Sequence, residues 1–142
     1  MAANGERAEG GFTLIESLVV LAIFGLVAAL GFPRLQQVLA TVSRREAVAA
    51  VAAELREVRA DAVRADREKL FFVASDGHAY GGSGSGRVPT PAGVEVRSAG
   101  GAPIGFFGDG SATGGGVWVS AGGKSTLVRV APMTGAISVG AL

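Results

Sequence analysis

The chain begins with a long apolar run. From Phe12 to Phe32 almost every side chain is apolar or small, and Glu16 is the one charged residue in the run. As an α-helix rising about 1.5 Å per residue, this stretch is roughly 30 Å long, which is enough to cross the hydrocarbon core of a bilayer. The pattern therefore predicts a transmembrane N-terminal helix over residues 12–33.

The next segment, residues 34–69, combines a helical period with many charges. Its apolar or small residues recur close to every 3.6 positions. This stripe consists of Leu35, Val38, Val42, Val48, Val51, Leu55, Val58 and Ala62. Basic and acidic side chains are nearly balanced, and Asp61–Arg64 and Arg64–Glu68 have the spacing of helical ion pairs. We therefore expect an amphipathic helix that packs its stripe on a sheet and exposes a charged face to solvent.

The second half of the chain, residues 70–142, holds short apolar segments between turn-forming clusters. The strand candidates are Leu70–Ala74, Gly93–Ser98, Ile104–Phe107, Val117–Ser120, Ser125–Val130 and Ala136–Val139. Turns are expected at Ala121-Gly122-Gly123 and Met133-Thr134-Gly135, and Gly81–Gly86 is interpreted as a flexible loop. The sequence thus predicts an α+β fold, with a long N-terminal helix packed on an antiparallel β-sheet head.

Composition narrows the classes of function. The 142 residues suit one domain with an attached helix, and 49% apolar against 18% charged residues favours an ordered core. A net charge of +1 gives no electrostatic reason to expect a nucleic-acid partner. The sequence has no cysteine and one histidine, which excludes a disulfide, a thiolate metal site and a histidine-rich metal site.

The residues around the apolar run argue against an ordinary secretory signal peptide. Met1–Gly11 carries Glu6, Arg7 and Glu9, so it lacks the basic bias of such signals, and the run exceeds a usual core of about 7–15 residues. A carboxylate at mid-bilayer costs at least about 2.5–3.5 kcal/mol, and such residues usually have a partner. Glu16 is therefore a candidate functional residue in a retained anchor.

The segment Gly10-Gly11-Phe12-Thr13-Leu14-Ile15-Glu16, followed by the apolar run, resembles the prepilin peptidase site of type IV pilins and pseudopilins. The resemblance implies that residues 1–11 are a leader, that cleavage falls between Gly11 and Phe12, and that Phe12 is then N-methylated. It also implies that Glu16 neutralises the amine of a neighbouring Phe12 during assembly. A buried carboxylate and ammonium offset each other's desolvation only when they are paired.

Two helix-weakening residues extend the resemblance. Proline removes a helix donor and glycine weakens a helix interior, so Gly25 and Pro33 mark a stretch that can lose helicity in a filament of this superfamily. Arg34, Arg44 and Arg45 follow the apolar run, whereas the leader has one basic residue. The positive-inside rule alone would favour the opposite topology, and the processing motif is the stronger guide.

Two patches of the second half resemble the C-terminal domain of the GspH/FimT group. They are Ile104–Gly115 and Val130–Ile137, with Gly108 standing where the group often has proline and Ala131 where it often has an acidic residue. The resemblance implies a minor pseudopilin, a structural and non-enzymatic subunit of the periplasmic pseudopilus of a type II secretion system. It would be a single-pass protein of the bacterial inner membrane with its head in the periplasm.

The implied partners are prepilin peptidase, the inner-membrane secretion platform, and major and minor pseudopilins that bind through the N-terminal helix. The alternative is a FimT-like minor type IV pilin acting in pilus assembly or DNA uptake. Members of that type carry basic residues near the C-terminus, whereas Gly135–Leu142 has no charged side chain. Pseudopilus membership is therefore the favoured hypothesis.

No residue pattern indicates a catalytic site, a metal site or a cofactor. His78 follows Asp76-Gly77 and is interpreted as a surface turn residue, and Asp109 as a side chain that caps a turn. The glycine-rich segment at 81–86 has neither the lysine–hydroxyl pair of a phosphate-binding loop nor the strand–helix context of a dinucleotide site. Trp118 and Phe106–Phe107 are interpreted as packing residues of a small sheet rather than as a ligand platform.

Overall fold

The structure is a computed structural model, and it describes residues 13–141. One long helix, α1 (Leu14–Ala65), precedes the strands of the described chain. Of the described residues, those up to Gln36 form one unit and those from Gln37 onward form a second, the head. The strands are β1 (Lys69–Val73), β2 (Ala79–Gly82), β3 (Val88–Pro89), β4 (Glu95–Ser98), β5 (Ile104–Phe106), β6 (Gly115–Ala121), β7 (Lys124–Val130) and β8 (Ile137–Ala141).

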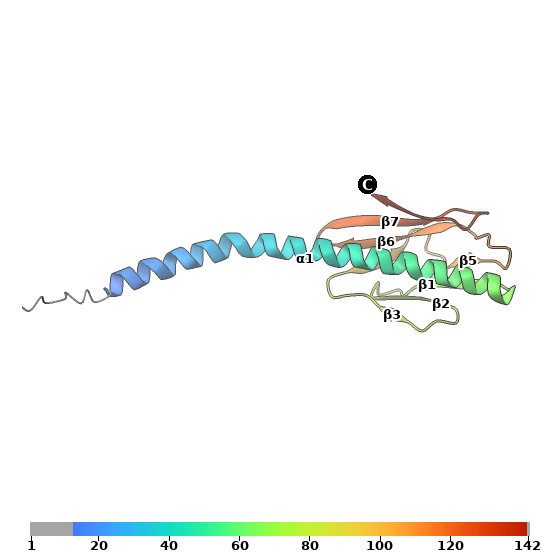
Figure 1. Ribbon diagram of the computed structural model, residues 1–142, viewed down its shortest axis with the longest axis horizontal. Helices are drawn as coiled ribbons and strands as arrows, with labels where there is room; N and C mark the ends of the chain where they lie inside the picture. The colour runs from blue at the N-terminus through green and yellow to red at the C-terminus, as the bar shows by residue number, and fades with distance from the viewer. Residues whose placement is uncertain (1–12, 142) are drawn as a thin grey trace, which may run out of the picture. The chain divides into compact units, whose positions relative to one another are not determined.

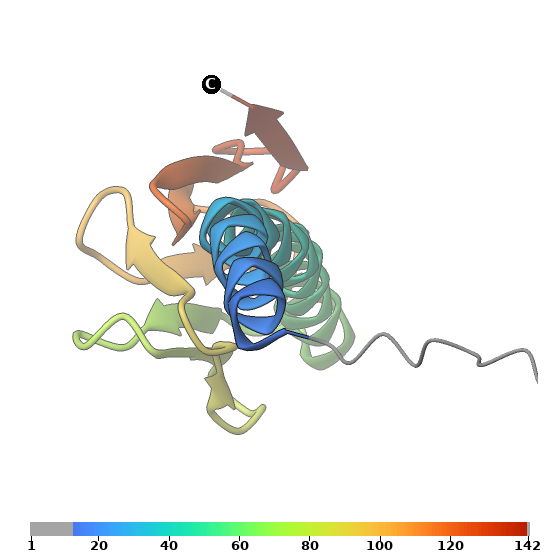
Figure 2. The same cartoon turned by 90° about the vertical axis from the view of Figure 1, so that its left-hand side faces the viewer.

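The head contains two four-stranded antiparallel sheets, where the sequence pattern had suggested a single sheet. Their strand orders are β3-β2-β1-β5 and β4-β6-β7-β8. Within the head, α1 runs alongside both sheets, with β6 and β7 on one side and β1 and β2 on the other (Figure 1, Figure 2). The α+β fold is confirmed, and each strand candidate overlaps an observed strand.

The core of the head lies between α1 and the two sheets. The buried helix residues are Ala47, Val48, Val51, Ala52, Leu55, Val58 and Ala62. Phe71, Phe106, Val117 and Val128 from the strands are also fully buried. The predicted stripe is thus confirmed from residue 48 onward. Its first three members, Leu35, Val38 and Val42, are 56%, 59% and 48% exposed, because the burial of α1 against the head starts only at Ala47.

The helix ends at Ala65, so the predicted end at residue 69 is wrong. Asp66 adopts a left-handed conformation with φ of 45°. The N–H of Asp66 donates to the Val63 carbonyl (3.3 Å) and the N–H of Arg67 to the Ala62 carbonyl (3.2 Å). These two bonds form a Schellman motif, in which a left-handed residue stops the helix and satisfies its last carbonyls. Glycine is the usual residue at this position, and aspartate gives no comparable signal.

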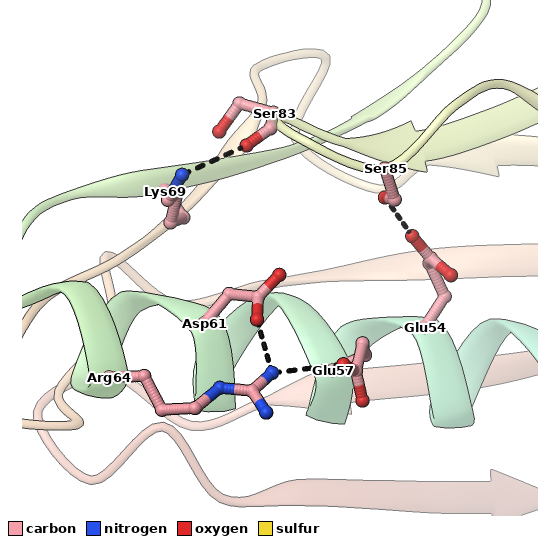
Figure 3. Close-up of polar contacts among 7 residues, drawn as sticks. All are labelled: Glu54, Glu57, Asp61, Arg64, Lys69, Ser83 and Ser85. Atoms are coloured by element: carbon pink, nitrogen blue, oxygen red, sulfur yellow. Dashed lines mark hydrogen bonds and ion pairs between the residues drawn. The ribbon is translucent and has the colours of Figure 1, made fainter.

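The predicted flexible loop at Gly81–Gly86 is also wrong, because Gly81 and Gly82 belong to strand β2. A Cβ atom on Gly82 would overlap Cγ2 of Val58 on α1, so only glycine lets the strand approach the helix this closely. The adjoining turn is tied down as well. The Ser85 hydroxyl donates to the Glu54 carboxylate (2.5 Å) and accepts the Gly82 N–H (3.0 Å), as Figure 3 shows for the first of these bonds.

Candidate membrane anchor and assembly segment

The first turn of α1 is built around Thr13 and Glu16. The N–H of Glu16 donates to both the hydroxyl oxygen (3.3 Å) and the carbonyl of Thr13 (3.0 Å), and the Ser17 N–H also reaches that carbonyl (3.2 Å). Thr13 is therefore the N-cap, and Glu16 stands three residues later, as in the sequence of a capping box. This geometry fixes Glu16 on the first turn of the helix, where a negative charge is favoured by the helix dipole.

The carboxylate of Glu16 is exposed. Within residues 13–141 it takes part in no ion pair. The predicted processing residues Gly11 and Phe12 lie outside the described residues. The structure therefore places Glu16 but not its expected partner, and the roles of all three residues stay predictions.

The apolar part of α1 is uncovered. Its large side chains are exposed from Leu14 (84%) to Phe32 (64%). An 18-residue window of the helix has a mean hydropathy of 2.4 and none of it is buried, so by length and composition α1 can cross a membrane. Exposed apolar surface of this extent is unfavourable in water and favourable in a bilayer. The observation supports a single-pass, membrane-anchored protein.

Gly25 and Pro33 both lie inside this continuous helix. Proline has no N–H to donate to the turn before it, so one backbone carbonyl of that turn lacks its usual donor. No heavy atom approaches within 4 Å of a Cβ built on Gly25, so no local packing requires glycine there. The isolated chain is helical at both positions, and the expectation that this stretch loses helicity in a filament stays a prediction.

One junction in the head was missed by the sequence interpretation. Arg59, on α1 and half-buried, donates from Nε to the Gly110 carbonyl (2.9 Å) and from Nη2 to the Thr134 carbonyl (3.1 Å). A Cβ on Gly135 would overlap the Gly110 carbonyl oxygen and lie 2.8 Å from Arg59 Nε. We call these four residues the Arg59 junction. It joins the helix to the loops after β5 and β7, which carry the two patches singled out in the sequence.

The charged face of α1 is solvated, as predicted. The Arg64 guanidinium contacts Asp61 and lies 3.0 Å from Glu57 (Figure 3). The bonds to Asp61 and then Glu57 raise the pKa of Arg64. The predicted pair with Glu68 does not form, because the helix ends at Ala65 and residue 68 lies beyond its last turn. Exposed pairs of this kind each contribute about 0–1 kcal/mol.

The isolated polar candidates are turn residues. The His78 N–H donates to Asp76 (2.9 Å), and the side chain of His78 is exposed. Asp109 accepts the N–H (2.9 Å) and hydroxyl (2.6 Å) of Ser111, and these bonds lower the pKa of Asp109. Both turn assignments are confirmed. Within residues 13–141, no group of three or more potential ligands could hold a metal ion.

The aromatic candidates fall into three environments. Phe106 is fully buried, as expected for a packing residue. Phe107 is 37% exposed, so the expectation of core packing is wrong for it. Trp118 is half-buried, on β6 between the fully buried Val117 and Val119. Side chains alternate between the faces of a strand, so Trp118 points away from the core.

Known protein families and known proteins were compared with this chain, and both comparisons found a match. Residues 7–32 match the family described as Prokaryotic N-terminal methylation motif. The chain is 28% identical to the type II secretion system protein H of Xanthomonas campestris pv. campestris, over 93% of this chain and 83% of that protein. At its start the chain is thus similar to proteins with this methylation motif, and over most of its length it is similar to an H-type protein of type II secretion. The pilin-like motif covers its capped first turn and its exposed apolar helix.

The fold of this protein is similar to that of a solved pseudopilin structure. The minor pseudopilin EpsH from the type 2 secretion system of Vibrio cholerae matches with a TM-score of 0.57 at 11% identity, covering 70% of this chain and 97% of that chain.

Gly108 stands where the GspH/FimT group often has proline, and the local packing explains this departure. A Cβ there would overlap the Asp66 carboxylate and lie 3.0 Å from the Asp66 backbone.

Proposed function

We infer that this protein is an H-type minor pseudopilin, a structural subunit of the pseudopilus of a type II protein secretion system. The observation that carries the inference is the exposed apolar start of α1, which opens on a capped turn bearing Glu16 and belongs to the same helix that forms the core of the head. The chain thus combines a candidate membrane anchor, up to Gln36, with a folded head from Gln37 onward.

We propose further that the chain is made with a leader, residues 1–11, which prepilin peptidase removes before Phe12 is methylated. The single-pass anchor would then hold the protein in the bacterial inner membrane, with the head in the periplasm. Loss of the leader would remove Glu6, Arg7 and Glu9 and leave a free amine beside the apolar helix. The match to the N-terminal methylation motif supports this step.

Glu16 is the proposed assembly residue. Its carboxylate is exposed on the first turn of α1, and the surrounding side chains Leu14, Ile15 and Leu18 are exposed and apolar. When such helices pack together in a membrane, the carboxylate loses water and needs a positive partner. The processed N-terminus of a neighbouring pseudopilin supplies an ammonium group of the required charge.

The role proposed for the protein is structural rather than catalytic. The similarity to a type II secretion system protein H supports it, and the side chains with altered pKa values are explained by local contacts. The pKa of Arg64 is raised by its bonds to Asp61 and Glu57, and the pKa of Asp109 is lowered by its bonds from Ser111. Burial raises the pKa of Tyr80. The partners would be other pseudopilins, prepilin peptidase and the inner-membrane secretion platform.

Processing is tested by measuring the intact mass of the full chain from membranes, with and without co-expressed prepilin peptidase. We expect loss of residues 1–11 and gain of one methyl group, both dependent on the peptidase. Loss of the entire apolar run without the peptidase would identify a secreted soluble protein and refute the proposal.

Assembly is tested separately with Glu16→Ala. We expect cleavage and membrane retention to persist, while recovery of other pseudopilins in a cross-linking pull-down falls sharply, because removing one partner of a buried charge pair costs about 3–5 kcal/mol. Glu16→Asp keeps the charge and should retain part of the recovery, and Ser17→Ala is the matched control on the next residue. Unchanged recovery for Glu16→Ala would contradict the assembly role.

A further inference from the structure

The two sheets of the head have four edges, and at three of them neighbouring chain or a proline occupies at least part of the edge. At β5 the N–H of Thr113 donates to the Gly105 carbonyl (2.9 Å), and the Thr113 hydroxyl accepts the Gly105 N–H (3.0 Å). At β4 the N–H of Val96 donates to the Gly77 carbonyl (2.9 Å). Strand β3 has two residues, and one of them, Pro89, has no N–H. Natural proteins close sheet edges by these means to prevent unwanted strand pairing.

The fourth edge, β8, presents free backbone groups. The N–H of Ala131 donates to the Ala136 carbonyl (2.9 Å), which makes this facing pair hydrogen-bonded. Bonded and non-bonded pairs alternate along antiparallel strands, and the register of β7 and β8 continues from this pair. Ser138 therefore bonds to β7, whereas the N–H and C=O groups of Ile137 and Val139 point outward. Among the described residues, no group bonds to these outward N–H donors.

The side chains along this edge suit an apolar neighbour. Val139 is 50% exposed, although Val128, which faces it across the strand pair, is fully buried. The apolar layer of the sheet therefore stops at Val139 without being covered. The segment Gly135–Leu142 contains no charged side chain, so nothing on this edge would repel an approaching uncharged strand.

We propose that β8 is a docking edge at which an extended, uncharged strand of a different pseudopilin adds to the sheet β4-β6-β7-β8. Backbone N–H and C=O groups two residues apart are matched by another extended strand. Its apolar side chains would cover Val139 and extend the layer formed by Val128. The identity of the partner as a neighbouring pseudopilin rests on the proposed function, which supplies a second head beside this one.

The contact is tested by site-specific photo-cross-linking in the full chain, co-expressed with the pseudopilins of its own secretion system. The cross-linking amino acid replaces Ser138 on β8, Arg97 on the edge strand β4, which carries charged side chains, or Leu21 in the apolar helix. We expect residue 138 to cross-link to a strand segment of another pseudopilin and residue 97 to give no such product. Residue 21 reports assembly through the helix and so tests the proposed function independently.

Backbone pairing is tested by changes at Val139 in the cross-linking chain. Val139→Pro removes an outward N–H and leaves the bonds to β7 intact, and proline is tolerated at such edge positions. We expect it to lower the residue-138 product by about tenfold or more. Val139→Thr keeps the N–H and the branched shape and should retain the product. Val139→Lys places a charge on the edge and should also abolish it, and fluorescence of the single tryptophan, Trp118, verifies folding.

The outcomes separate the two proposals. A product at residue 138 that disappears with Val139→Pro and persists with Val139→Thr supports the docking edge. A product formed only with a second copy of this chain, or one insensitive to Val139→Pro and Val139→Lys, overturns it. Products from residue 21 without any from residue 138 also overturn it and leave the pseudopilin function standing. Loss of products from both positions refutes the proposed function as well.

Discussion

The close approach of β2 to α1 makes Gly82 sensitive to the addition of any side chain. In Gly82→Ala the added methyl group would overlap Cγ2 of Val58 and lie 3.0 Å from the Ser85 hydroxyl oxygen. That hydroxyl already accepts the Gly82 N–H and donates to Glu54. Val58 is 3% exposed and enclosed by the core, so it cannot rotate away freely.

The expected cost follows from overpacking. Inserting a methyl group into a packed core typically costs about 1–3 kcal/mol, and the burial of Val58 together with the bonds at Ser85 places this change at the upper end. Val58→Ala alone removes two buried methyl groups, at about 0.8 kcal/mol for each buried carbon. The same change removes the obstructing Cγ2 atom. The double variant should therefore be more stable than the sum of the single changes predicts, by about 1 kcal/mol or more.

The measurement is urea unfolding of the full chain in detergent, followed by the fluorescence of the single tryptophan, Trp118. Gly86→Ala is the matched control, because no heavy atom lies within 4 Å of a Cβ built there. Additive losses in the Gly82 and Val58 variants, or equal losses for Gly82→Ala and Gly86→Ala, would refute the reasoning.

Two further predictions concern α1 within the head. Arg59→Ala leaves the Gly110 and Thr134 carbonyls without their donor and should lower the free energy of unfolding by about 1–3 kcal/mol, whereas the exposed Arg56→Ala should change it little. If Arg59→Ala and Arg56→Ala lowered the free energy of unfolding in urea equally, the stabilising role given to the Arg59 junction would be wrong. Asp66→Gly should raise the melting temperature by relieving a left-handed residue, a gain of at most about 1 kcal/mol, whereas Asp66→Ala should lower it. A melting temperature that falls as much for glycine as for alanine would show that the aspartate side chain is what holds the helix end.

The sequence predicted what depends on local patterns. The apolar run, the stripe from Val48 to Ala62 and most strands of the head follow from periodicity, and the structure confirms them. Glu16 was singled out because a charge in an apolar helix is costly, and the structure places it on the capped first turn. The cleavage site at Gly11–Phe12 lies outside the described residues, so its chemistry stays a prediction.

What the sequence did not predict depends on contacts between distant residues. Gly81 and Gly82 carry no strand signal of their own, and their conformation is explained only by the nearness of Val58 on the helix. The end of α1 was missed because Asp66 stands where glycine is usual. Arg59 was counted among many surface charges of an amphipathic helix, and its two carbonyl partners lie 51 and 75 residues later in the chain.

The Arg59 junction also constrains how the chain can evolve. Its arginine bonds to carbonyls, which every residue type possesses, but it needs glycine at position 135 for space and at position 110 for a backbone φ of 82°. A descendant that loses the arginine is not released from the requirement at position 135, because a Cβ there would still overlap the Gly110 carbonyl oxygen and the backbone φ is 61°. We therefore expect glycine to persist at positions 110 and 135 among close relatives, even where the arginine at position 59 has been replaced.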